Sequence, residues 1–209
     1  MSKSILIDCM PFKFTQKQIN ESINNNNGRL IVQGPVQRAE ALNQNLRKYP
    51  KHILEREATK YEQTEIAQNR ALGELDHPES SVVNLRNASH NILQLEWKGD
   101  ELWAKIEILN TPSGNILKEL FKAGITLGIS SRGLGSVTQL DEDTSEVQDD
   151  FQLICWDFVS NPSTQGAFMK PISEGKQIKI KETKEEKAER LIHEIICAVS
   201  GVCCINKGK

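Results

Sequence analysis

Alternating apolar and polar residues predict strands through the middle of the chain. The clearest case is a hairpin, in which residues 92–97 and 102–108 alternate on either side of a glycine turn at residues 98–100. Short aliphatic runs bounded by turn residues predict further strands at residues 29–34, 125–130 and 149–159. Period-2 segments of this kind favour an antiparallel sheet or a closed barrel over a parallel α/β sheet.

Helices are predicted between these strands. From Pro50, apolar residues recur at helical spacing to about residue 67, with the proline near the start of the helix. A second helix is predicted over residues 114–122, with Ser113 as its N-cap and Gly124 at its end. Strands with helices inserted between them make this an α+β chain.

The two ends of the chain differ from this middle. Residues 1–28 finish in four asparagines and a glycine, a polar run typical of a loop, and are assigned to an N-terminal extension. Residues 173–209 begin with a segment dominated by charge and continue into an apolar stripe at helical spacing, which predicts a charged linker and an amphipathic helix. That helix could pack on its own domain, bind a partner or form a removable pro-segment. The main domain is therefore assigned to residues 29–172.

Composition narrows the function classes. The 209 residues suffice for one domain with tails, and 26 basic against 28 acidic residues give a net charge of −2. No overall basic field exists to attract nucleic acid, so DNA or RNA binding is not supported. No apolar run is long enough to span a bilayer, and charge interrupts the N-terminus too early for a signal peptide. We therefore expect a soluble intracellular protein that does not bind membranes.

Five cysteines, an odd number without an export signal, indicate reduced thiols rather than a disulfide framework. His193, Cys197, Cys203 and Cys204 gather near the C-terminus, but their spacing matches no standard zinc pattern. We expect apolar cysteines on a helix there, and no metal site.

Three segments carry residue types suited to nucleophilic catalysis. His77 lies in a turn-like segment and could serve as a base, and Ser130 ends an apolar run at the start of a predicted glycine-rich turn. Asp157 alternates with Trp156 and Phe158, so its side chain faces away from them. Together the three would form a Ser-His-acid triad in an order, His then Ser then Asp, that none of the familiar triads has.

The residues after Ser130 bear on the same chemistry. Ser130 and Ser131 point to opposite faces of a strand, so only one can face His77, and from the residues alone a nucleophile and a structural hydroxyl are equal alternatives. The glycines at 133 and 135 could turn N–H groups toward an oxyanion. Arg132 could add charge there, anchor an acidic substrate residue, or simply form a surface ion pair.

These segments resemble the prohead core protein proteases of T-even-type tailed phages, which are related in fold to other phage prohead proteases and to the herpesvirus assembly protease. The resemblance runs from about residue 36 to residue 167. The matching blocks are residues 39–50, Gly-Glu-Leu-x-His-Pro at 73–78, Ser-Ser-Arg-Gly-Leu-Gly at 130–135, and Asp157 followed by Asn161, Pro162 and Ser163.

The resemblance implies a small antiparallel β-barrel decorated with helices, and roles for individual residues. It implies Ser130 as nucleophile, His77 as general base and acid, and Asp157 as the orienting acid. Asp76 and Glu74 remain alternatives for the third role, for which the herpesvirus relatives use a histidine. Ser131, Arg132, Gly133 and Gly135 are assigned to oxyanion or substrate binding, and no cofactor is needed.

The function implied is a serine endopeptidase enclosed in the prohead within the host cytoplasm. It would cut scaffold or core proteins and the major capsid protein before DNA is packaged, and would cut itself, as a zymogen whose copies could associate. One alternative is an inactive internal scaffold protein that keeps the protease fold. The other is an esterase or amidase using the same residues.

Overall fold

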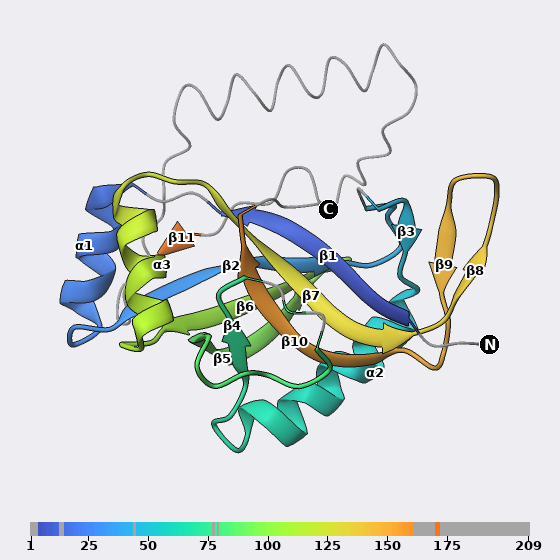
Figure 1. Ribbon diagram of the computed structural model, residues 1–209, viewed down its shortest axis with the longest axis horizontal. Helices are drawn as coiled ribbons and strands as arrows, with labels where there is room; N and C mark the ends of the chain where they lie inside the picture. Colours follow the sequence, from blue (N-terminus) through green and yellow to red (C-terminus); the bar gives the residue numbers. More distant parts are fainter. Residues whose placement is uncertain are drawn as a thin grey trace, which may run out of the picture. The chain divides into compact units, whose positions relative to one another are not determined.

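The computed structural model describes residues 4–12, 15–43, 45–76, 78, 80–160 and 170–171 (Figure 1). The chain divides into two compact units, residues 1–174 and 175–209. The second unit, with the predicted charged linker, amphipathic helix and cysteine-rich end, lies outside the described residues.

The strands of the described ranges form three sheets (Figure 1). A three-stranded antiparallel sheet has the order β1 (Ser4–Phe12), β7 (Leu127–Gly135), β10 (Gln152–Val159). A five-stranded sheet has the order β11 (Lys170–Pro171), β2 (Leu30–Arg38), β6 (Glu101–Ile108), β5 (Ala88–Lys98), β4 (Leu72–Glu74). The third contains β3 (Arg47–Lys48), β9 (Ser145–Val147) and β8 (Val137–Gln139). The predicted hairpin is confirmed as β5 and β6, with Lys98 opposite Glu101.

Both predicted helices form, and they differ from the prediction at one N-cap. α2 (Lys51–Tyr61) starts directly after Pro50 and continues as the π-helix η1 (Glu62–Ile66), which confirms a helix to about residue 67. α3 (Pro112–Lys122) ends before Gly124, whose φ is +75°. Its N-cap is Thr111, not the predicted Ser113, because proline fits the first helical position and the Thr111 hydroxyl accepts the Gly114 N–H at 3.0 Å.

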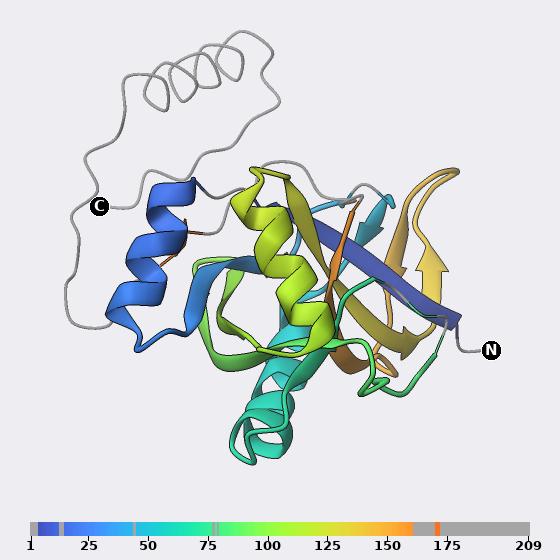
Figure 2. The ribbon, with the colours of Figure 1, turned by 60° about the vertical axis from the view of Figure 1, so that its left-hand side comes forward.

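The first thirty residues hold structure that the sequence analysis did not assign. α1 (Gln16–Asn25) begins with a capping box between Thr15 and Gln18, and β1 pairs along its full length with β7. α1 and α3 lie side by side at one end of the sheets, whereas α2 packs against β10 (Figures 1 and 2). No helix of the described ranges combines the length and apolar character needed to cross a bilayer.

The sheets are not closed into a barrel, so that expectation is wrong. β4 and β10 meet at the place where closure would be needed, but a single parallel bridge, Leu75 to Phe158, joins them. β4 is only three residues long, and side chains rather than a ladder occupy the rest of this junction. We call this place the β4–β10 seam. The fold is a mixed α+β arrangement of open sheets.

Candidate active site

β7 positions most of the predicted site residues, and it does so as a strand. The expected glycine-rich turn after Ser130 is wrong, because β7 continues to Gly135 between β1 and β10. The glycine at 133 instead allows close packing, since a Cβ there would lie 2.4 Å from Cε2 of Phe151. Gly135 is similarly crowded, with its Cβ position 3.0 Å from Cα of Phe151.

The register of β7 and β10 sorts the predicted residues onto two faces. Ser130 lies opposite Asp157, and Arg132 lies opposite Cys155. Directly opposed residues of an antiparallel pair point the same way, so these four share one face, which we call the polar face. Ser131 lies opposite Trp156 on the other, apolar face, and its buried hydroxyl has no hydrogen-bond partner within the described part of the chain. The predicted opposite orientation of the two serines is confirmed.

An ion cluster of Glu74, Arg132 and Asp157 occupies the polar face, and all three side chains are fully buried. Nε of Arg132 donates to Oδ2 of Asp157 at 2.8 Å, and Nη2 donates to Oε1 of Glu74 at 2.9 Å. Oδ1 of Asp157 also accepts the backbone N–H of Glu74 at 2.9 Å. With both carboxylates ionised, the cluster carries a formal charge of −1, which favours a cation next to it.

Cys155 is the other potential nucleophile on this face. Its Sγ lies 3.1 Å from Nη2 of Arg132 and 3.3 Å from Oδ1 of Asp157. Burial, reinforced by the Asp157 charge, raises the pKa of the Cys155 thiol well above its ordinary value. The thiol therefore stays protonated at neutral pH and is a poor nucleophile.

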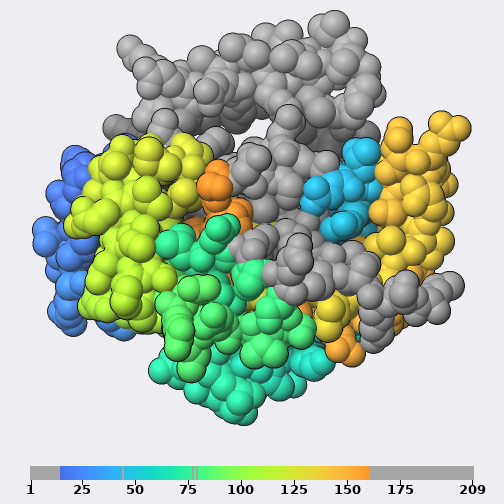
Figure 3. All heavy atoms as spheres, in the orientation of Figure 1, coloured from blue at the N-terminus to red at the C-terminus, as the bar shows by residue number. Residues whose placement is uncertain are grey.

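The segment between β4 and β5, residues 75–87, is fastened to this cluster. Nη1 of Arg132 donates to the carbonyl of Ser80 at 2.6 Å, and Oε1 of Glu74 accepts the N–H of Asn84 at 2.9 Å. At its start, Asp76 donates its N–H to the carbonyl of Phe158 at 2.8 Å. Residues 80–87 of this segment lie on the surface shown in Figure 3, where they are coloured green. His77 belongs to this segment but lies outside the described residues.

A buried histidine crosses the β4–β10 seam. Nε2 of His90 donates to the carbonyl of Trp156 at 3.0 Å, and Nδ1 lies 2.9 Å from the Ser89 hydroxyl. Because a carbonyl only accepts, the ring carries its proton on Nε2 and Nδ1 accepts from Ser89. Burial lowers the pKa of His90 to about 4, so the ring is neutral at neutral pH.

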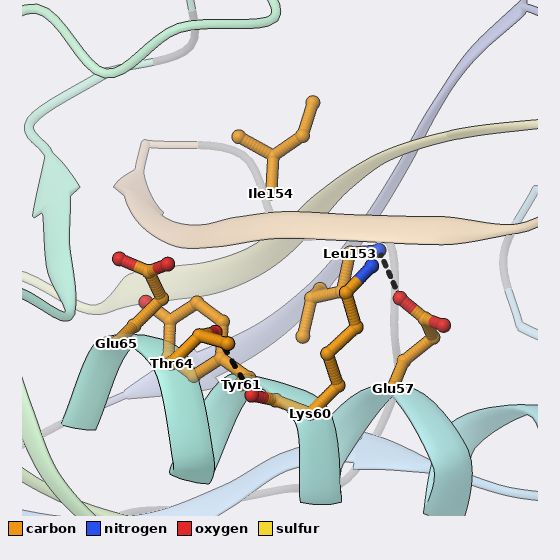
Figure 4. A pocket seen from close by; sticks show the side chains of 7 residues that line it. All are labelled: Glu57, Lys60, Tyr61, Thr64, Glu65, Leu153 and Ile154. Atoms are coloured by element: carbon orange, nitrogen blue, oxygen red, sulfur yellow. Dashed lines mark hydrogen bonds between the residues drawn. The ribbon is translucent and has the colours of Figure 1, made fainter. Parts of the chain in front are cut away.

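A pocket of about 210 Å³ lies between the helix formed by α2 and η1 and the start of β10 (Figure 4). Residues of α2 and η1 form its floor, and a β-bulge turns Leu153 toward the helix and Ile154 away from it. Tyr61 lines it and packs edge-on against Trp156, with ring centroids 5.1 Å apart. Since Trp156 points away from the polar face, this pocket is separate from the ion cluster.

The structure thus brings Ser130, Arg132 and Asp157 together and directs Ser131 and Gly133 to the other face. From the sequence alone, Glu74 was only an alternative acid, and Cys155 had no place in the site. Alternation along β10 was the available signal for Cys155, two residues before Asp157. Among the described residues, no group of three or more His, Cys, Asp or Glu side chains is arranged to hold a metal ion.

The chain is similar in sequence and in structure to known proteins. Residues 4–177 match the family model of the prohead core protein serine protease. The chain is 34% identical over 145 residues to the prohead core protein protease of Enterobacteria phage T4, a match that covers 68% of each chain. It also resembles the solved structure of the bacteriophage T4 capsid assembly protease, with a TM-score of 0.67 and 26% identity, over 78% of this chain and 100% of the other.

Proposed function

Since the chain belongs to the prohead core protein serine protease family, we propose that it is a serine endopeptidase with Ser130 as its nucleophile. Family membership supports peptidase activity in the assembling phage prohead. The inactive scaffold protein is not favoured, because the family and both relatives are described as proteases.

The observation that carries the residue roles is the pairing of Ser130 with Asp157 across β7 and β10. Position 77 lies between two anchored points, Asp76 on the carbonyl of Phe158 and Ser80 on Arg132. The described residues on either side of His77, Asp76 and Ser80, are thus each held by β10 or β7. We assign His77 as general base and acid and Asp157 as the acid that orients it.

The proposed reaction is an acyl transfer to Ser130 and then to water. The Ser130 hydroxyl attacks the scissile carbonyl while its proton passes to the His77 imidazole. The imidazolium then protonates the leaving amine as the C–N bond breaks, and water repeats the sequence on the acyl-enzyme. The formal charge of −1 on the ion cluster favours the transient imidazolium, which is the electrostatic contribution the site would make.

Full burial of Ser130 supports the further proposal that this chain is a zymogen, because a substrate could not reach the hydroxyl without rearrangement. We propose that scaffold or core proteins, the major capsid protein and the chain's own tail are the substrates, with the tail cut within one molecule or between associated copies. Mass spectrometry of the C-terminus after incubation tests this. An intact Lys209 in protein that cleaves core proteins would contradict the pro-segment.

Substitution of the serines tests the nucleophile. We expect Ser130→Ala and His77→Ala to abolish self-cleavage and core-protein cleavage, measured by mass spectrometry, while circular dichroism stays unchanged. Ser22→Ala is the matched control, because Ser22 is a similarly buried serine whose hydroxyl donates to the carbonyl of Ile31 and accepts the N–H of Ile31, away from the ion cluster. Activity that survives Ser130→Ala but is lost in Ser131→Ala would move the nucleophile by one residue. Activity in both variants would refute the serine mechanism.

A further inference from the structure

The guanidinium of Arg132 is arranged to hold the protein together at the site rather than to bind a substrate. We infer that Arg132 is a positioning residue that fixes Ser80 and Asn84, in the segment after β4, against the strand that carries Ser130. This inference rests on the proposed function for its catalytic consequence. We call the hydrogen bonds from Arg132 to Ser80 and from Asn84 to Glu74 the clamp. The clamp can be tested without any measurement of enzyme activity.

The contacts of Arg132 join four parts of the chain. From β7 it reaches Asp157 on β10, Glu74 on β4 and the carbonyl of Ser80 in segment 75–87. Glu74 extends the clamp, since its Oε1 accepts from both Arg132 and the N–H of Asn84. Segment 75–87 is therefore attached at two points to side chains of the ion cluster.

The same contacts argue against a role for Arg132 in binding an acidic substrate residue. Its side chain is fully buried, and each of its three nitrogens donates to a protein acceptor. A substrate carboxylate would have to displace Glu74 or Asp157, and would leave that group buried without its partner. Segment 75–87 itself is exposed, with 70% of Val82 and 72% of Leu85 accessible to solvent. Few apolar contacts therefore secure these parts of the segment, which makes the polar anchors important.

Arg132→Lys is the informative substitution. A lysine keeps a positive charge for the two carboxylates, which favours folding, but its single ammonium group cannot reproduce the planar fork that reaches Glu74, Asp157 and Ser80 together. Arg56→Lys is the matched control. Arg56 likewise donates to a carboxylate, that of Glu57, and to a backbone carbonyl, that of Phe151, away from the ion cluster.

The first measurement is hydrogen exchange in the Ser130→Ala background, where self-cleavage cannot interfere. We expect the Asn84 amide to exchange at least about tenfold faster in Arg132→Lys, while the amides of the β5–β6 hairpin exchange at an unchanged rate. In the Arg56→Lys control, the exchange of the Asn84 amide should also stay unchanged. Unchanged exchange of Asn84 would overturn the clamp. If Arg132→Lys does not fold, Glu74→Gln replaces it, because it weakens the same link while keeping an oxygen for the Asn84 N–H. The same acceleration is expected.

The second measurement is the kinetics of cleavage of a synthetic peptide. The peptide covers residues 166–182 of this chain, which include the start of the tail that we propose as a substrate. Loss of positioning should lower kcat by about a hundredfold and change KM by less than about threefold. A raised KM with kcat retained would instead make Arg132 a substrate-binding residue and refute the inference. If the wild-type protein cuts neither this peptide nor core proteins, the proposed function fails, and the exchange result still decides whether the clamp exists.

Discussion

Acid should lower the free energy of unfolding of this protein, because His90 is buried at the β4–β10 seam in its neutral form. The imidazole is completely buried, with both ring nitrogens hydrogen-bonded and the ring packed edge-on against Phe158 at a centroid distance of 4.8 Å. Burial therefore opposes protonation and lowers the pKa of His90 from 6.5 to about 4. In the unfolded chain the same ring titrates with its ordinary pKa.

Between these two pKa values the unfolded state binds more protons than the folded state. The contribution of neutral His90 to the free energy of unfolding is thus fully present above pH 6.5 and is lost as the pH falls toward 4. With these values the loss is about 2 kcal/mol between pH 7 and pH 5, and about 3 kcal/mol by pH 4.

Urea unfolding at pH 7 and pH 5 measures this loss. The wild-type midpoint should fall by about 1 M more than that of His90→Gln, whose side chain has no such titration. His52→Gln is the control, because its imidazole is 70% exposed and bonds Asp149 rather than a group of the seam. Parallel pH dependence of wild type and His90→Gln would refute the reasoning. So would a His90 imidazole that titrates near pH 6.5 in NMR spectra of the folded protein.

Two further substitutions test contacts that β10 makes with β4 and α2. Gly73→Ala should lower the free energy of unfolding by about 3 kcal/mol or more, because its Cβ would lie 2.0 Å from the backbone oxygen of Trp156. Gly99→Ala, in open space with a φ of +64°, should lower it by only about 1 kcal/mol, and equal losses in urea unfolding would contradict the clash. Glu57→Ala should cost about 1–3 kcal/mol, since it removes the acceptor of the Leu153 N–H at 3.0 Å. Glu57→Gln keeps an acceptor oxygen, so a loss as large as that of the alanine variant in thermal melts would refute this role.

Local signals predicted much of the secondary structure. The β5–β6 hairpin and the helix after Pro50 depend on alternation, a glycine turn and a proline at a helix start, and all of these act over a few residues. β1 was missed because its strand character depends on pairing with β7, more than a hundred residues away. The prediction of a turn at Gly133 and Gly135 was wrong because it, too, ignored tertiary packing. Phe151 occupies the space that side chains at these two positions would fill, and β7 stays extended there.

The candidate site was predictable only in part. Alternation correctly separated Ser130 from Ser131 and turned Asp157 away from Trp156. It could not reveal that Arg132 is buried between two carboxylates, because one of them, Glu74, lies fifty-eight residues earlier in the chain. Residue types left a substrate contact and a surface ion pair open for Arg132, and only tertiary structure shows that its ion pairs are buried.

The failed prediction of a barrel bears on how the site is built. In a closed barrel, the edge of β4 that faces β10 would donate its N–H groups to carbonyls of β10. Here the N–H of Glu74 donates instead to the Asp157 side chain, and His90 donates to the carbonyl of Trp156. The open seam thus leaves room for a side-chain cluster between two sheet edges. Because the segment leading to His77 leaves β4 at this seam, the same departure from a barrel brings that segment beside the strand pair that carries Ser130 and Asp157.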